Sequence, residues 1–167
     1  RLDCAFASHR DREAATHALR LLLATTGGLA ALPDMERTGS LLDALAAGVL
    51  QRATLARVLV DARRSGIFLL REARGLPDAV PVTDGLVWDG RYRLTLQEDG
   101  AGACVAPAGI GTKSAASLSS DVPESLARAA FASTPRVAPS GENVAVAPVV
   151  APFARFLPGF DLESAGI

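Results

Sequence analysis

The chain has 167 residues and a formal net charge of −1 at pH 7, and 49% of its residues are hydrophobic. That length predicts one domain, or one domain with a helical appendage, and the near-neutral charge is unlike the basic composition of a dedicated nucleic-acid module. The apolar runs are shorter than a membrane span and are interrupted by Pro and Gly. We therefore expect no membrane segment, and no leader peptide is apparent after Arg1.

Two helices are predicted before residue 50. The first covers residues 8–26, with Ser8 as its N-cap and Gly27-Gly28 as its stop. The second covers residues 35–47, or begins only at Ser40, because Gly39 inside a helix costs about 1 kcal/mol relative to Ala. Two short helices are marginal alone, so this hairpin must pack on another element.

The first helix and its surroundings hold the residues considered as metal ligands. His9 and His17 are not at the helical spacing of about three or four that ligands on one face prefer. Solvated histidines are therefore favoured over a metal site with Cys4 as third ligand, and we predict no metal site. Cys4 and Cys104 are far apart and lack paired spacing, so two free thiols in a cytoplasmic protein are expected.

The pattern changes from helical to alternating near residue 50, which predicts an α+β fold. A helical segment, 1–50, should precede a small, mainly antiparallel β domain, 51–167, with one or two helices. Strands are expected at residues 53–62, 67–71, 80–82, 86–88, 92–97, 103–106, 137–138 and 144–149. A further helix is expected over 121–132 with Asp121 as its cap, and the tail from Pro152 should form an irregular strap.

The stretch 87–96 holds the only Trp and the only Tyr of the chain. Asp89-Gly90 is a strong signal for a type I′ hairpin turn, which needs positive φ at both centres. Alternation after the turn predicts one exposed and one buried face: Arg91, Arg93 and Thr95 against Tyr92, Leu94 and Leu96. These arginines are either solvated charges or forks that match the oxygens of a polyanion.

Residues 109–120 form a Gly-, Ser- and Ala-rich loop. Gly109-Ile110-Gly111-Thr112-Lys113-Ser114 looks superficially like a nucleotide-binding loop. Its Gly-Thr-Lys-Ser is not the Gly-Lys-Ser/Thr that such a loop requires, and no strand-to-helix unit surrounds it. A loop that carries one lysine is the better interpretation.

Several segments together resemble the region beyond the catalytic domain of tRNA(Ile)-lysidine synthetases of the alphaproteobacterial type. The matching segments are His17-Ala18-Leu19-Arg20-Leu21-Leu22-Leu23 followed by Gly27-Gly28, Ala53-Thr54-Leu55, Leu70-Arg71-Glu72-Ala73-Arg74-Gly75-Leu76-Pro77, Trp88-Asp89-Gly90-Arg91 followed by an aromatic residue, and Pro152-Phe153-Ala154-Arg155-Phe156-Leu157-Pro158-Gly159-Phe160-Asp161. The resemblance covers most of the chain.

This resemblance implies a function for the parent protein. Enzymes of the family use ATP to adenylate the wobble cytidine of an isoleucine tRNA, and lysine then displaces AMP. Their ATP site uses a Ser-Gly-Gly-x-Asp-Ser loop, which this sequence lacks. The resemblance thus places no catalytic or cofactor residue here, assigns ATP and lysine to a separate catalytic domain, and implies an inactive, tRNA-holding chain. Its expected partners are tRNA and its own N-terminal catalytic domain, and a homodimer stays open.

The candidates for tRNA contact are Arg71, Arg74, Arg91, Arg93 and Lys113. We expect the four arginines to lie on adjacent strands of one sheet, where a local cluster acts even on a neutral chain. The alternative is a structural or protein-interaction module, in which the arginines pair with Asp61, Glu72, Asp84 and Asp89 and no tRNA binds. A stand-alone enzyme for a small molecule is disfavoured, because the sequence shows no reactive constellation.

Overall fold

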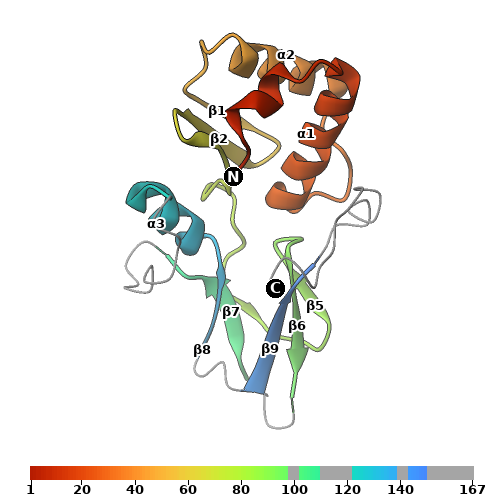
Figure 1. Ribbon diagram of the computed structural model, residues 1–167. Helices are drawn as coiled ribbons and strands as arrows, with labels where there is room; N and C mark the ends of the chain where they lie inside the picture. The colour runs from red at the N-terminus through yellow and green to blue at the C-terminus, as the bar shows by residue number, and fades with distance from the viewer. Residues whose placement is uncertain (98–101, 110–121, 139–142, 150–167) are drawn as a thin grey trace. The chain divides into compact units, whose positions relative to one another are not determined.

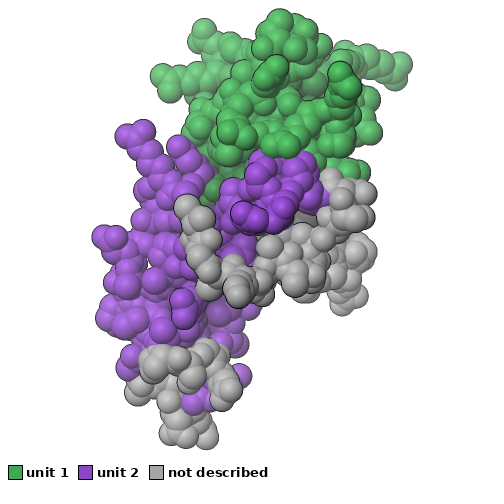
Figure 2. All heavy atoms as spheres, turned by 90° about the vertical axis from the view of Figure 1, so that its left-hand side faces the viewer, with its two compact units in different colours: residues 1–71, 150–167 green, residues 72–149 purple. Residues whose placement is uncertain are grey.

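A computed structural model of the chain describes residues 1–97, 102–109, 122–138 and 143–149 (Figure 1). The chain divides into two compact units, coloured in Figure 2. Unit 1 is Arg1–Arg71 together with Val150–Ile167, and unit 2 is Glu72–Val149. Helices at the N-terminus are followed by three small antiparallel sheets, so the predicted α+β class is confirmed. The predicted strap from Pro152 and most of the loop at 109–120 lie outside the described residues.

The first long helix of unit 1, α1 (Arg12–Gly27), begins later than predicted. Its N-cap is Asp11, whose Oδ1 accepts a hydrogen bond from the Ala14 amide at 2.9 Å. Ser8 is not the cap, because it ends a separate 3-10 helix, η1 (Cys4–Ser8). The predicted stop is confirmed, since Gly28 adopts φ 66°, in the left-handed region that suits glycine at a helix C-terminus.

The second helix, α2 (Met35–Ala46), takes the earlier of its two predicted starts. The carboxylate of Asp34 caps it by accepting from the Arg37 amide at 2.8 Å. This cap places Gly39 inside the helix despite its low propensity. The helix is also amphipathic, with Leu41, Leu42 and Leu45 buried.

Three strands complete unit 1: β1 (Arg52–Leu55), β2 (Val58–Arg63) and β3 (Gly66–Arg71), paired in that order and antiparallel. The single strand predicted over 53–62 is therefore two strands. The chain reverses at Ala56-Arg57, which adopt φ 56° and 64°, and neither residue type signals such a turn. The end of α1 packs closely here, because a Cβ added to Gly27 would lie 2.2 Å from the Ala56 carbonyl oxygen.

The core of unit 1 lies between the helices and one face of this sheet. Leu19, Leu23 and Leu42 from the helices pack with Val58 and Val60 from β2, and all five are fully buried. Strands and helices thus share one core, and this compact unit extends to Arg71. The helices cover the apolar face of the sheet, and the sheet covers the apolar faces of the helices.

Unit 2 consists of two antiparallel sheets and one helix. One sheet pairs β4 (Val80–Pro81), β7 (Cys104–Pro107) and β8 (Pro135–Ala138), and the other pairs β5 (Leu86–Trp88), β6 (Tyr92–Leu96) and β9 (Val144–Pro148). The helix, α3 (Glu124–Ala132), lies between β7 and β8 in the sequence. Both sheets contribute to the core, which includes Trp88, Leu94 and Val105. The N-cap of α3 is Pro123, and the predicted cap, Asp121, lies outside the described residues.

The β5–β6 hairpin confirms the prediction made from Asp89-Gly90. These residues adopt φ 52° and 70°, and the Arg91 amide donates to the Trp88 carbonyl at 3.1 Å, which closes a type I′ turn. The alternation on β6 is also confirmed, because Leu94 is buried and Arg93 and Thr95 are exposed. Arg91 itself lies in the turn, where alternation no longer sets the direction of its side chain.

Candidate functional site

The arginines predicted to contact tRNA belong to two different units. Arg71 ends β3 in unit 1, whereas Arg74 follows it in a loop, and Arg91 and Arg93 belong to the β5–β6 hairpin in unit 2. The expectation that the four arginines lie on one sheet is wrong, because β3 pairs with β2 while β6 pairs with β5 and β9. Lys113 lies outside the described residues.

Arg71 is buried rather than presented to solvent. Only 3% of the residue is exposed, and its partner across the ladder, Val58, belongs to the core against the helices. Cross-strand partners share a face of the sheet, so the strand register directs Arg71 toward the interior of the molecule. A polynucleotide backbone has no access to its guanidinium.

Arg91 is committed to contacts within unit 2. Its Nε donates to Asp89 Oδ2 at 2.7 Å, and Nη2 donates to the backbone carbonyl of Ser133 at the end of α3. Its guanidinium also lies over the Tyr92 ring, 5.1 Å from the centroid. The Arg91 and Asp89 side chains are 12% and 0% exposed. This residue therefore ties the hairpin turn to the end of α3.

Arg74 and Arg93 are the two predicted arginines that reach the surface. Arg93 lies in the middle strand of its sheet, between Val87 on β5 and Ala147 on β9, and all three residues are exposed. It thus stands on an outer sheet face between small apolar neighbours. Of the predicted set, these two positions are the ones a phosphate can approach in the described structure.

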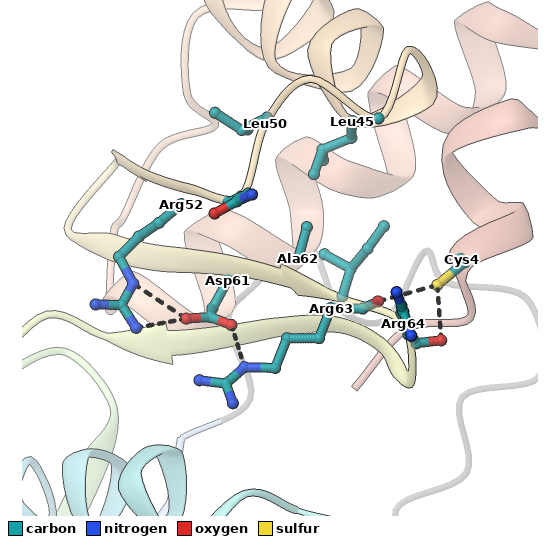
Figure 3. Close-up of a pocket in the computed structure, with 11 residues that line it drawn as sticks. Cys4, Leu45, Leu50, Arg52, Asp61, Ala62, Arg63 and Arg64 are labelled. Carbon is teal, nitrogen blue, oxygen red and sulfur yellow. Dashed lines mark hydrogen bonds and ion pairs between the residues drawn. The ribbon is translucent and has the colours of Figure 1, made fainter.

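A second group of arginines, in unit 1, was not singled out from the sequence. Arg52 on β1 lies directly across the ladder from Asp61 on β2, and Arg63 follows two residues later on the same face. Arg52 donates to Asp61 Oδ2 from Nε at 3.0 Å and from Nη2 at 2.6 Å, and Arg63 Nε donates to Oδ1 at 2.6 Å (Figure 3). Both carboxylate oxygens therefore have partners.

The charges within this group are unequally buried. The Asp61 side chain is 6% exposed, whereas those of Arg52 and Arg63 are 59% and 35% exposed. The hydrogen bond from Arg63 is the main cause that lowers the pKa of Asp61, burial opposes it, and Arg52 lowers it further. The aspartate thus stays ionised and holds two guanidinium groups in place at the surface.

A hollow of about 840 Å³ adjoins this group. Its lining includes Arg52, Asp61, Arg63, Arg64 and Cys4, together with Leu45, Leu50 and Ala62 (Figure 3). The Cys4 thiol donates to the backbone carbonyls of Arg63 and Arg64 at 3.4 and 3.8 Å. The cluster requires the unforeseen reversal at Ala56-Arg57, which brings Arg52 opposite Asp61.

Within the described ranges, no group of three or more His, Cys, Asp or Glu side chains gathers to hold a metal ion. Cys4 and Cys104 are both free and exposed. In that part of the chain no helix has the length and apolar character needed to cross a bilayer.

Comparison with known proteins identifies relatives of one kind. The chain is 46% identical over 170 residues to a tRNA(Ile)-lysidine synthase of Mesorhizobium japonicum. This match covers 93% of the present chain and 37% of the Mesorhizobium protein. It is also 32% identical over 158 residues to a tRNA(Ile)-lysidine synthase of Rhizobium meliloti. That match covers 86% of the present chain and 34% of the Rhizobium protein. No protein-family model and no solved structure matches. The chain spans about a third of the length of these curated relatives, and its resemblance to tRNA(Ile)-lysidine synthases is confirmed over most of its residues.

Proposed function

We propose that this chain is the non-catalytic, tRNA-holding C-terminal part of a tRNA(Ile)-lysidine synthase, which ligates lysine onto the wobble cytidine of an isoleucine tRNA using ATP. The observation that carries the proposal is the 46% identity to a protein of that name over 93% of the chain. The match spans only 37% of that relative, which supports assignment to one region of a longer protein. The partners are then tRNA and the catalytic domain of the same cytoplasmic enzyme.

Surface arginines provide a physical basis for holding tRNA. A tRNA stem is recognised mainly by its shape and its backbone, and arginine–phosphate contacts supply affinity without choice of sequence. Arg74 and Arg93 are exposed in unit 2, and Lys113 is retained as a candidate from the sequence. In this proposal they contact backbone phosphates, while Arg71 and Arg91 serve the fold because both are largely buried.

The test is equilibrium binding of the full chain to an isoleucine tRNA over a series of salt concentrations. Binding at low salt should weaken as salt rises, because phosphate contacts release counterions. The double variant Arg74→Ala, Arg93→Ala should bind more weakly, with the log–log slope shallower by about 0.7 to 0.9 for each phosphate that it no longer neutralises. The change should be similar for unrelated tRNAs, since phosphate contacts carry no sequence information.

Arg128→Ala serves as the control in this series, because Arg128 is an exposed arginine of unit 2 that pairs with Glu124 on the same helix. Its binding should match that of the parent chain. A parent chain that binds no tRNA even at low salt contradicts the holding role. Release of AMP from ATP by this chain alone, with tRNA and lysine present, contradicts its assignment as non-catalytic.

A second candidate is a structural or protein-interaction module without nucleic-acid binding. Ion pairing of the arginines favours it: Asp89 pairs with Arg91, and Asp61 pairs with both Arg52 and Arg63. Such pairs reduce the positive charge available to a phosphate backbone. This module predicts no binding to tRNA, even at the lowest salt concentration of the series.

A further inference from the structure

We propose that Arg52 and Arg63, both oriented by Asp61, together with the neighbouring Arg64 form a second binding site for the phosphate backbone of RNA in unit 1. We call these four residues the Asp61 cluster. The choice of RNA as ligand rests on the proposed function, whereas the site itself rests on the geometry of the β1–β2 hairpin. It shares no residue with the set predicted from the sequence.

The local charge of the cluster is the first argument. Three arginines are among the residues that line the hollow, and Asp61 is the one carboxylate among the described residues that line it. The cluster therefore carries an excess of two positive charges on a chain whose formal net charge is −1. A local excess of one sign attracts counterions regardless of the net charge of the whole protein.

The donors that remain available are the second argument. In the described structure Arg63 uses only Nε on Asp61, so its two terminal nitrogens point away from the carboxylate (Figure 3). Arg52 uses Nε and Nη2 on one oxygen, which leaves Nη1. A guanidinium with two such donors matches phosphate oxygens in a fork. Asp61 reduces the entropic cost of binding, because it already fixes both arginines.

The shape of the hollow distinguishes a polynucleotide from a free anion. Its volume of about 840 Å³ lies in the range of sites that hold organic ligands, roughly 300 to 1,000 Å³, and greatly exceeds an inorganic phosphate. Arg52 and Arg63 contact Asp61 at one edge of this hollow (Figure 3). A polynucleotide places a phosphate at these arginines and has further atoms to occupy the hollow.

The experiment compares tRNA binding by the parent chain with that of the triple variant Arg52→Gln, Arg63→Gln, Arg64→Gln over a salt series. The triple variant should bind more weakly, and its log–log slope should be shallower by about 0.7 to 0.9 for each backbone phosphate left without its arginine. Arg64→Gln alone tests the site without disturbing Asp61, since Arg64 takes no part in the ion pairs of this cluster. It should lower the slope by the amount expected for a single phosphate.

Arg37→Gln is the matched control, because Arg37 is an exposed arginine on α2 of the same unit. An equal effect of Arg37→Gln overturns the proposal, because it shows that total charge alone is responsible. The site is also overturned if the parent chain, Arg64→Gln and the triple variant all bind tRNA equally well. That result would leave the proposed function intact. A parent that binds no tRNA overturns both.

Discussion

Asp61 and Arg63 in unit 1, and Asp89 and Arg91 in unit 2, are both aspartate–arginine pairs with one residue between them. Arginine Nε meets a carboxylate oxygen at 2.6 Å in the first pair and at 2.7 Å in the second. The surroundings differ, because Arg63 is 35% exposed and Arg91 is 12% exposed. Arg91 also donates to the Ser133 carbonyl and covers the Tyr92 ring, whereas Asp61 shares its charge with a second arginine, Arg52.

The difference shows that burial decides what such a pair does. In unit 2, a buried carboxylate pairs with a largely buried guanidinium, so the pair holds a turn. In unit 1, one carboxylate orients two guanidinium groups that remain at the surface, so the cluster keeps positive charge and donors for a ligand. The same local sequence pattern therefore supports the fold in one unit and a candidate site in the other.

The largest effect is expected from breaking the buried pair. Arg91→Ala leaves the Asp89 carboxylate buried without this partner and removes the link to Ser133, so unit 2 should lose about 3–5 kcal/mol of unfolding free energy. Urea denaturation followed by Trp88 fluorescence measures this, because the only Trp lies in the core of unit 2. Arg93→Ala, an exposed arginine on the same hairpin, should change stability by no more than about 0.5 kcal/mol. Equal losses of unfolding free energy for the two variants would show that the buried Arg91 contributes no more to stability than the exposed Arg93.

A smaller effect, visible in its pH dependence, is expected at Asp61. Its pKa is lowered below the ordinary value of 3.8, chiefly by the hydrogen bond from Arg63. A depressed carboxyl pKa contributes stability that is present above the unfolded-state pKa and is lost as pH falls through the folded-state pKa. Unit 1 should therefore lose this contribution as pH falls below about 4, and Asp61→Asn should flatten that part of the profile.

Far-UV circular dichroism during urea denaturation suits this measurement, because α1 and α2 both lie in unit 1. Asp43→Asn is the control for the loss of one negative charge, since Asp43 forms an exposed ion pair with Arg12. The ordinary pKa of a carboxyl group is about 4. If the parent and Asp61→Asn lose the same unfolding free energy as the pH falls below about 4, ionisation of Asp61 contributes nothing to the stability of unit 1.

The smallest effect is expected where the pair is fully accessible to solvent. Arg128 and Glu124 form an exposed pair one helical turn apart on α3, and pairs of this kind contribute about 0.3–0.5 kcal/mol. Arg128→Ala should lower the stability of unit 2 by no more than that, and the loss should vanish at high salt. A loss of stability close to that of Arg91→Ala would show that burial does not determine how much these ion pairs contribute to stability.

Local signals in the sequence were reliable at two glycine-containing sites, where a few neighbouring residues decide the conformation. Gly27-Gly28 ends α1 and Asp89-Gly90 forms the type I′ turn, since both depend on backbone φ values that only some residue types adopt readily. Alternation correctly placed Leu94 inside and Arg93 outside. The resemblance to tRNA(Ile)-lysidine synthases was also visible from short segments, and the curated relatives confirm it.

Tertiary packing decided the positions of Arg52 and Arg71. The reversal at Ala56-Arg57 carries no turn signal, yet it sets the register that places Arg52 opposite Asp61. Arg71 has the charge of a surface residue, but its register opposite Val58 buries it. The charge of a residue and its spacing in the sequence predict only how it relates to its sequence neighbours. The exposure of its side chain depends on which distant strand or helix packs against it, and this packing is fixed only when the whole unit folds.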